Sequence, residues 1–409
     1  MDASTLKRLS GNAGALLAIQ LANALLPLVL APYLTRVLGR DGYGAFAFGA
    51  ALIQFAAIIT DYGFGISAVY QISRARGHRE RIRRIAGAVL LVKLALFALV
   101  SAAVIGYVMT ADHVPGGSVY IVLLLISILG LTLQPVWLFQ ALEKMASVTI
   151  YIVASRLAFV LLVLLFCRSA DDLPLVAVLN GMAYLFAALA GLYVMRGRGL
   201  APCWPGLKRI RVIAGASTEY FWSRIAVVSY GAGATIFLGV FGTASQVAIF
   251  SVAEQFYRGA IAIYSPVTQA IYPYMARSRD IALFRKIFVG AFFVAVLGVA
   301  FGIICGPMLI SMIFGEGYQE SYPVLVVFLL ALLAAIPSIL LGYPFLGALG
   351  QAKVANRSVF LAGFVQVLAL GAIYFLGVGS ALTVVVAVLL AESSALIWRA
   401  RAAYPYLKA

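Results

Sequence analysis

The sequence contains few of the side chains that enzymes use for acid–base, thiol and metal chemistry. Among its 409 residues there are 2 His, 3 Cys, and 14 Asp and Glu together. Cys167, Cys203 and Cys305 lack the paired spacings of a zinc site, and they indicate no disulfide framework. The chain shows no phosphate-binding Gly-Lys-Ser/Thr loop and no pattern of a serine or cysteine triad. We therefore expect no metal, no cofactor and no enzymatic activity.

Charged residues of either sign are also scarce. They make up 11% of the chain, against 64% hydrophobic residues, and the mean hydropathy is +1.04. This apolar content exceeds that of soluble domains and indicates an all-α membrane protein with many spans. Lys7 and Arg8 precede the first apolar run without a small-residue cleavage site, so we expect a retained first helix rather than a removed signal peptide.

The apolar runs that can cross a hydrocarbon core of about 30 Å predict about twelve transmembrane helices. The expected ranges are 11–38, 42–72, 82–110, 117–142, 147–168, 173–196, 212–239, 244–275, 284–314, 320–349, 354–377 and 379–403. The Lys and Arg residues are counted over loops that include the ends of the neighbouring spans, namely 1–10, 73–84, 143–146, 196–211, 276–286, 350–357 and 399–409 on one side of the membrane. Of the 30 Lys and Arg residues, 23 lie in these loops, 3 lie in the opposite loops, and 4 lie in the interior of spans. Cytoplasmic loops are enriched in Lys and Arg, so both termini are expected to be cytoplasmic.

The basic loops explain the net charge of +16 without a nucleic-acid partner. The most basic loop, 73–84, is interpreted as a topology determinant that also contacts the anionic headgroups of membrane lipids.

Eight charged residues lie in the interior of the expected spans, away from the span ends. They are Asp61, Lys93, Arg156, Glu219, Arg224, Glu254, Arg258 and Glu392. If all of them faced lipid, the cost would be roughly 20 kcal/mol or more. They are therefore expected to face one another or water, which predicts an internal polar cavity.

The chain also shows an internal duplication. A shift of 203 positions places Gly39 on Gly242 and Arg74 on Arg277, and without a gap Gly87 falls on Gly290. We expect two six-helix bundles, residues 1–200 and 201–409, with the same orientation in the membrane and with a central cavity between them.

Residues 31–76 resemble the start of the polysaccharide-biosynthesis membrane proteins, the O-antigen and exopolysaccharide repeat-unit flippases. These belong to the exporter superfamily that includes multidrug and toxic-compound extruders and lipid II flippases. The residues that carry the resemblance are Pro32, Tyr33, Leu34, Arg36, Leu38, Gly39, Gly42, Tyr43, Gly44, Asp61, Gly63, Ser73 and Arg74, with a weaker likeness in 314–318.

The resemblance implies transport of an undecaprenyl-pyrophosphate-linked oligosaccharide from the cytoplasmic to the outer leaflet of the bacterial inner membrane, by alternating access. It also implies that the first two helices of each half line the cavity. Other polysaccharide-assembly membrane proteins are expected as further partners.

A glycan diphosphate needs cations at one end and polar groups elsewhere. Arg224 and Arg258 are candidates for the diphosphate, because a guanidinium matches phosphate oxygens and stays charged. The alternative is structural pairing, since Glu254 stands four residues before Arg258 and Glu219 stands five before Arg224. Lys93 and Arg156 are further candidates for binding the substrate. The alternative is that their side chains extend toward the cytoplasmic interface.

Uncharged polar residues complete the expected binding set. They are Gln20 and Asn23 on the first helix, and Tyr220 and Ser223 on the seventh. For each of them, hydrogen bonding between helices is the alternative.

The acidic residues Asp61, Glu219, Glu254 and Glu392 are candidates for coupling transport to H⁺ or Na⁺. Asp61 is alternatively a cap for a helix distortion at Gly63 and Gly65. The four tryptophans are interpreted as anchors at the membrane interface.

Two other functions remain open. A drug or toxin antiporter on the same scaffold would prefer anionic or aromatic groups for cationic cargo, whereas four cations among the eight buried charges favour anionic cargo. A glycan polymerase or ligase would need a large outer loop, and the expected outer loops are short.

Overall fold

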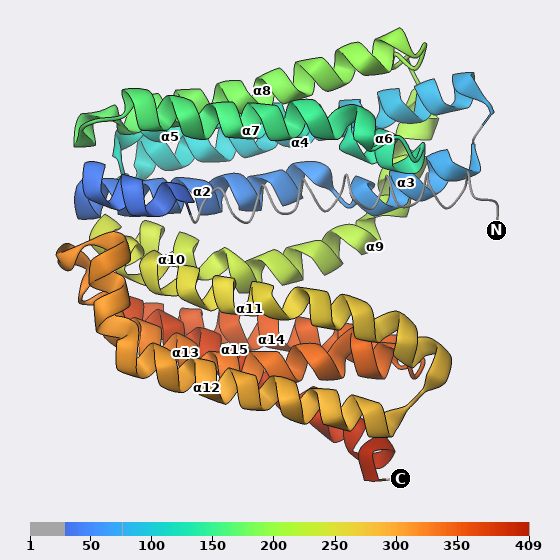
Figure 1. Ribbon diagram of the computed structural model, residues 1–409. Coiled ribbons are helices and arrows are strands. Elements are labelled where there is room, and N and C mark those ends of the chain that lie inside the picture. The colour runs from blue at the N-terminus through green and yellow to red at the C-terminus, as the bar shows by residue number, and fades with distance from the viewer. Residues whose placement is uncertain (1–28, 76, 409) are drawn as a thin grey trace. The chain divides into compact units, whose positions relative to one another are not determined.

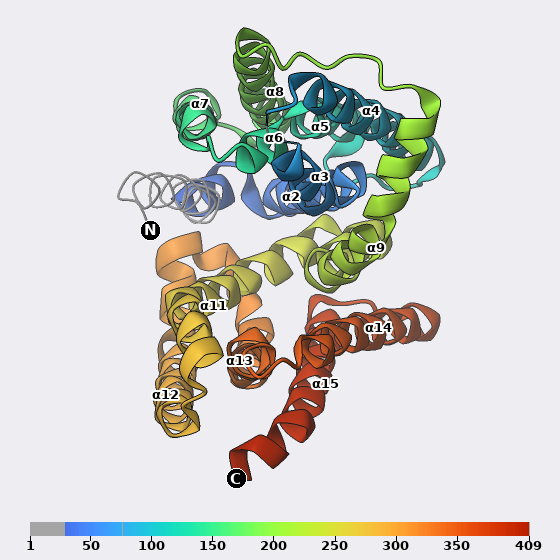
Figure 2. The ribbon, with the colours of Figure 1, turned by 90° about the vertical axis from the view of Figure 1, so that its right-hand side faces the viewer.

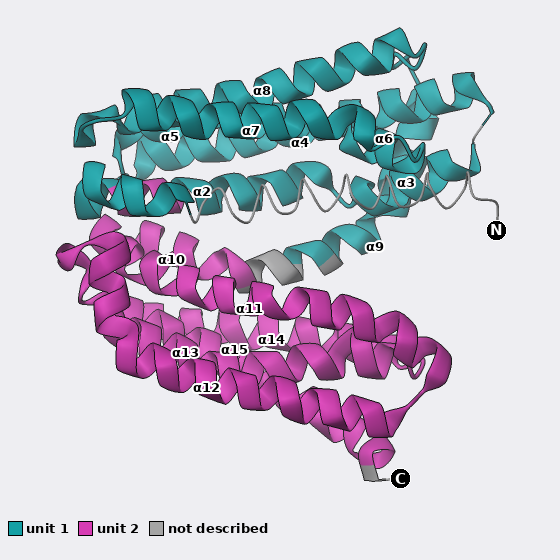
Figure 3. Ribbon diagram, viewed as in Figure 1, with its two compact units in different colours: residues 1–42, 49–225 teal, residues 43–48, 226–409 magenta. Residues whose placement is uncertain are grey.

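The computed structural model describes residues 29–75 and 77–408, with the backbone alone at 223, 226–230 and 408. Every regular element in these residues is a helix, which confirms the all-α prediction. The chain forms two compact units, residues 1–42 with 49–225 and residues 43–48 with 226–409 (Figure 3). The expected boundary at 200 precedes α9, whose residues 207–225 cluster with the first unit.

The first unit is a bundle of long helices seen end-on in Figure 2. Its elements are α2 (Gly39–Asp61), α3 (Phe64–Arg74), α4 (Arg79–Thr110), α5 (Gly117–Leu133), α6 (Val136–Ala141), α7 (Ala146–Phe166), η1 (Ala170–Asp172), α8 (Leu173–Gly197) and the first part of α9 (Leu207–Gly231) (Figure 1). The α8 helix packs against α5 and α7, and α3 packs against α4 and α6. A buried cluster forms the hydrophobic core of this part of the unit. It draws mainly on α3, α4 and α6, and Phe64, Ile85 and Trp137 are among its members.

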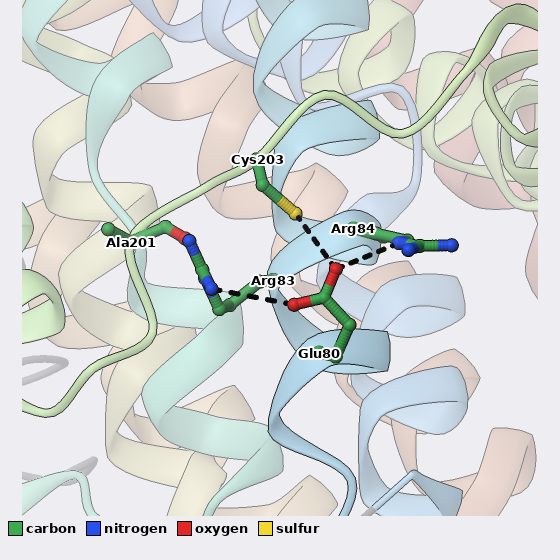
Figure 4. A network of polar contacts seen from close by, with 5 residues as sticks. All are labelled: Glu80, Arg83, Arg84, Ala201 and Cys203. Atoms are coloured by element: carbon green, nitrogen blue, oxygen red, sulfur yellow. Dashed lines mark hydrogen bonds and ion pairs between the residues drawn. The ribbon is translucent and has the colours of Figure 1, made fainter.

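The segment that leads into α9 is fixed to the start of α4. Arg83 donates from Nε to the carbonyl of Ala201 at 3.0 Å, and its own carbonyl accepts from the backbone N–H of Cys203 at 3.3 Å. Glu80 contacts Arg83 and Arg84 at 3.4 and 3.0 Å, with the Cys203 thiol 4.0 Å from one of its oxygens (Figure 4). These contacts set where α9 begins in the first unit.

The second unit consists of the remaining long helices. They are α10 (Gly233–Phe241), α11 (Ala244–Ser278), α12 (Ile281–Phe314), η2 (Glu316–Tyr318), α13 (Ser321–Leu340), η3 (Leu341–Gly347), α14 (Ala352–Leu376) and α15 (Ala381–Lys408). The α13 helix packs against α11, α12 and α15, so it lies at the centre of the unit, and α14 packs against α15. Because α15 continues to Lys408, the expectation of a loop from 399 onward is wrong.

Nine helical segments of the described chain are long and apolar enough to cross a membrane. They coincide with nine of the twelve expected ranges. Of the other three, 11–38 lies largely outside the described residues, and 212–239 and 244–275 are helical but less apolar than the nine. The protein is therefore a multi-pass integral membrane protein, while the count of twelve stays a prediction.

The helix bounds repeat with the offset expected from the sequence. Shifting 39–74 (α2 with α3) by 203 gives 242–277, and α11 spans Ala244–Ser278. Shifting α4 in the same way gives 282–313, and α12 spans Ile281–Phe314. The duplication thus extends from matched residues to matched helices.

The interruptions of the helices repeat as well. The chain leaves the helix at Gln134 and Pro135, between α5 and α6, and the shifted position is occupied by Pro337 near the end of α13. Proline removes a backbone donor and breaks the hydrogen-bond ladder of a helix, which explains both interruptions. In α13 the break continues into η3, where Gly342 has a non-helical ψ of −120°.

Candidate functional site

A break between α2 and α3 places a carboxylate inside the first unit. Asp61 is the last residue of α2, and Tyr62 and Gly63 follow with positive φ angles of 48° and 79° before α3 begins. The side chain of Asp61 accepts from the backbone N–H of Gly65 at 3.3 Å. This confirms the interpretation of Asp61 as a cap at the distortion, because the break leaves backbone donors that a membrane helix cannot expose to lipid.

Two cations from other helices meet the same carboxylate. Arg224 of α9 donates from Nη1 to one Asp61 oxygen at 2.6 Å, and Lys93 Nζ of α4 lies 4.0 Å from the other oxygen. The Lys93 side chain is 4% exposed, that of Asp61 20% and that of Arg224 38%. The alternative in which Lys93 extends toward the interface is therefore wrong. Local pairing of Arg224 with Glu219 is also superseded, since its carboxylate partner is 163 positions away.

The first part of α9 is held against the break by several polar contacts. Ser67 and Ser217 share a hydrogen bond of 2.6 Å, and the hydroxyls of Tyr62 and Thr218 share one of 3.1 Å. The Tyr62 ring lies 4.6 Å from that of Phe221, centroid to centroid. These contacts fix α9 where Arg224 reaches Asp61.

Gly63 allows this close approach of α9. A Cβ on Gly63 would lie 2.7 Å from the Cβ of Tyr220 and 3.0 Å from the carbonyl of Ser217. The glycine therefore provides both the left-handed turn and the space that α9 needs.

A cavity of about 150 Å³ adjoins the ionic cluster. Its lining residues are Asp61, Gly65, Lys93, Leu131, Gln134, Val136, Trp137 and Gln140. The break at Pro135 brings the last four of these residues to the cavity, because it separates the short helix α6 from α5. Trp137 is buried in the core, so its interpretation as an interfacial anchor is wrong, whereas Trp204, Trp222 and Trp398 are exposed.

The charges of the cluster do not cancel. Asp61 faces both Lys93 and Arg224, so the three groups carry one net positive charge when all are ionised. A buried charge needs an opposite charge nearby. Lys93 shares the Asp61 carboxylate with Arg224, which is the closer of the two cations. The neighbouring amides of Gln134 and Gln140 add hydrogen-bond donors at the cavity wall. The arrangement therefore favours an anion or a strongly polar group.

Of the other residues expected in the first unit, those that the structure describes do not join this cluster. Arg156 is buried between α7 and α8, where it donates to Asn180 Oδ1 at 3.0 Å and lies 3.3 Å from the centroid of the Tyr184 ring. Glu219 and Tyr220 have exposed side chains on α9. Gln20, Asn23 and the side chain of Ser223 lie outside the described residues.

In the second unit the expected charges form two separate pairs. Arg258 donates to Glu254 at 2.7 Å on α11, which confirms the pairing expected from their spacing. Glu392 of α15 is buried and accepts from the hydroxyl of Tyr257 at 2.5 Å.

Sequence reasoning missed a third charged contact in the second unit. Arg399 donates to the hydroxyl of Ser358 at 2.7 Å and to the carbonyl of Ser338 at 2.8 Å. The sequence places Arg399 in the terminal loop 399–409, because it follows the most apolar part of the last expected span. The cavity residues Gln134 and Gln140 were also missed, although the Gln134-Pro135 pair inside an apolar run is a signal that could have identified the break.

Comparisons with known proteins agree on one family and one fold. A family model described as "Polysaccharide biosynthesis protein" matches residues 9–279. A protein of Escherichia coli (strain K12), named as a candidate O-antigen transporter, is 27% identical over 326 residues, which are 76% of this chain and 77% of the relative.

Two solved structures share the fold of the chain. The lipid II flippase MurJ in its inward closed conformation has a TM-score of 0.72 at 11% identity, over 94% of this chain and 87% of its own. An inward-facing multidrug resistance transporter of the MATE family has a TM-score of 0.67 at 14% identity, over 96% of this chain and 95% of its own. The fold is therefore that of the MATE and MurJ proteins.

Proposed function

This chain belongs to the family of polysaccharide biosynthesis proteins, and we propose that it is a flippase for lipid-linked oligosaccharides. Its cargo is an oligosaccharide repeat unit on undecaprenyl pyrophosphate, which it moves from the cytoplasmic to the outer leaflet of the bacterial inner membrane. The family match and the relative named for O-antigen transport support the class of cargo. The fold shared with a lipid II flippase supports the translocation of a lipid-linked cargo. The direction of transport and the mechanism of alternating access are part of this proposal.

The observation that carries this proposal is the surplus cation beside the cavity of the first unit. A diphosphate is a compact anion, and Lys93 and Arg224 offer it two cations that share a single carboxylate. Arg224 presents several donors in a fork that matches phosphate oxygens, and Lys93 acts as a point charge. The diphosphate then replaces part of the interaction that each cation makes with Asp61.

The remaining candidate residues have other roles, in contacts with the sugars or in ion coupling. Arg258 is already paired with Glu254, so it contributes less free charge than the Lys93 and Arg224 pair. Arg156, Gln20, Asn23, Tyr220 and Ser223 remain candidates for the sugars. Asp61, Glu219, Glu254 and Glu392 remain candidates for H⁺ or Na⁺ coupling.

A drug or toxin antiporter is the second candidate, because the fold is shared with a multidrug transporter of the MATE family. Cationic cargo would need a carboxylate without a bound cation at the cavity. In the described part of the first unit, the carboxylate that lines the cavity faces two cations, which disfavours this alternative.

The proposal is tested by replacing the two cations in the host cell. Lys93→Gln and Arg224→Gln should each retain insertion and abundance, while lipid-linked glycan accumulates on the cytoplasmic side and surface polysaccharide falls. Lys353→Gln removes an exposed cation of α14 and serves as the matched control. Normal surface polysaccharide with both cluster cations replaced would refute the assignment. If the parent chain exports cationic dyes, and the Lys93 and Arg224 variants do not change glycan delivery, the antiporter would be favoured.

A further inference from the structure

An open groove runs along one face of α12, apart from the charged contacts described so far. It has a volume of about 680 Å³ and is lined by Arg285, Lys286, Val289, Gly290 and Phe293. Separations of three and four positions link these residues, so they share one side of the helix. Val289 and Phe293 are exposed, and a Cβ on Gly290 would meet no heavy atom within 4 Å. Gly290 is therefore an empty notch between two apolar side chains.

The groove lies where the helix leaves the apolar part of the membrane. The α12 helix has 34 residues and a length of about 51 Å, whereas the hydrocarbon core is about 30 Å thick. No charged residue occurs in 287–314, and Arg285 and Lys286 come directly before this run. The two cations are thus at the level of the lipid headgroups, and Val289, Gly290 and Phe293 follow toward the acyl chains.

The outer face of α12 is available to lipid. Only 11% of its most apolar window is buried, the smallest share among the nine candidate spans of the described chain. Its buried residues form a narrow stripe, including Phe284, Ala295 and Val299, on the side that packs against its neighbours. The remaining surface of the helix is apolar and faces outward.

The charge of the groove is uncompensated in the described part of the chain. Asp280 precedes the helix, but its carboxylate accepts from the backbone N–H of Leu283 at 2.9 Å and caps the first turn. Among the described residues, the ion pairs are formed by other cations, and neither Arg285 nor Lys286 takes part in one. Two adjacent cations above an apolar notch match a molecule with a phosphate at one end and a hydrocarbon chain at the other.

We propose that this groove binds an anionic glycerophospholipid of the surrounding bilayer. The phosphate contacts Arg285 and Lys286, and one acyl chain occupies the notch at Gly290 between Val289 and Phe293. The site is on the outer face of α12, so it is distinct from the cavity of the first unit and does not depend on the proposed cargo. Basic pockets on membrane helices bind anionic headgroups by the same electrostatic attraction.

The test is native mass spectrometry of the purified full chain with phosphatidylglycerol or phosphatidylcholine added to the detergent. The parent should retain phosphatidylglycerol in preference to phosphatidylcholine. The double variant Arg285→Gln with Lys286→Gln should lower phosphatidylglycerol retention by about tenfold or more. Lys353→Gln with Arg357→Gln, which removes two exposed cations from α14, should leave retention unchanged.

A second pair of variants separates the groove from simple surface charge. Gly290→Leu fills the notch and keeps both cations, so it should also lower retention. Gly298→Leu adds the same side chain at another open position of α12 and should have no effect. Equal retention of the two lipids, an unchanged Gly290→Leu variant, or an equal loss in the α14 control would each overturn the proposal.

Discussion

Replacing Asp61 by Asn removes the negative charge of the cluster while keeping an oxygen that can accept from the backbone of Gly65. Lys93 Nζ lies 4.0 Å from the carboxylate, and at an effective dielectric constant of about 20 this pair is worth about 4 kcal/mol. The Arg224 contact is shorter, but its side chain is 38% exposed, so it adds only about 1 kcal/mol. We expect Asp61→Asn to lower the free energy of unfolding by about 3–5 kcal/mol, mainly because Lys93 becomes an unpaired buried cation.

A double variant tests whether the unpaired Lys93 causes the loss of stability. Adding Lys93→Met to Asp61→Asn removes the unpaired cation and replaces it with an apolar side chain of similar length, so most of the lost stability should return. Trp137 is buried beside the cavity and can report unfolding by its fluorescence in detergent, in a protein whose exposed tryptophans Trp204, Trp222 and Trp398 are replaced by Phe. Lys353→Met is the control for a general effect of removing a lysine. An unchanged Asp61→Asn variant, or no recovery in the double variant, would refute the reasoning.

Two further predictions concern the second unit and the topology. Arg399→Met should lower the free energy of unfolding by about 2 kcal/mol, because its charged hydrogen bonds to Ser338 and Ser358 are lost. The control is Arg401→Met, on the exposed side of α15, which should have little effect. Both variants are measured in a thermal unfolding assay. The topology is tested with His78→Cys, at an exposed position, in a chain whose three native cysteines are replaced. This cysteine should react with a membrane-impermeant thiol reagent only from the cytoplasmic face. Labelling from outside would contradict the orientation predicted from the basic loops.

Most of the helices could be predicted from the sequence, because long apolar runs interrupted by basic loops have few alternative structures in a membrane. The offset of 203 also predicts the repeated helix bounds from the sequence alone. The hydropathy pattern did not reveal where helices break without leaving the membrane. Gly63 and Gly65 suggested the first break, but Pro135 and Pro337 needed the structure to show how α6 and η3 continue beyond them.

The partners of the charges were harder to predict than their burial. Local spacing correctly paired Glu254 with Arg258, because both lie on one helix and need no tertiary information. The same argument assigned Glu219 to Arg224, and it was wrong because Asp61 reaches Arg224 from a different helix. Contacts between helices distant in sequence depend on how the helices are rotated about their axes, which hydrophobicity alone fixes poorly in a span that is apolar on all sides.

Some of the buried charges are needed to stabilise helix breaks, and one of them is not. A helix break inside a membrane leaves backbone groups that must be satisfied, and Asp61 and Arg399 each meet such a group, the N–H of Gly65 in one unit and the carbonyl of Ser338 in the other. Once Asp61 is present, one cation is enough to neutralise it, and Arg224 already provides that cation at 2.6 Å. Lys93 adds a second positive charge, almost fully buried and costly in an apolar segment, which the break itself does not require. A costly charge beyond structural need agrees with the anionic cargo that we propose for this chain.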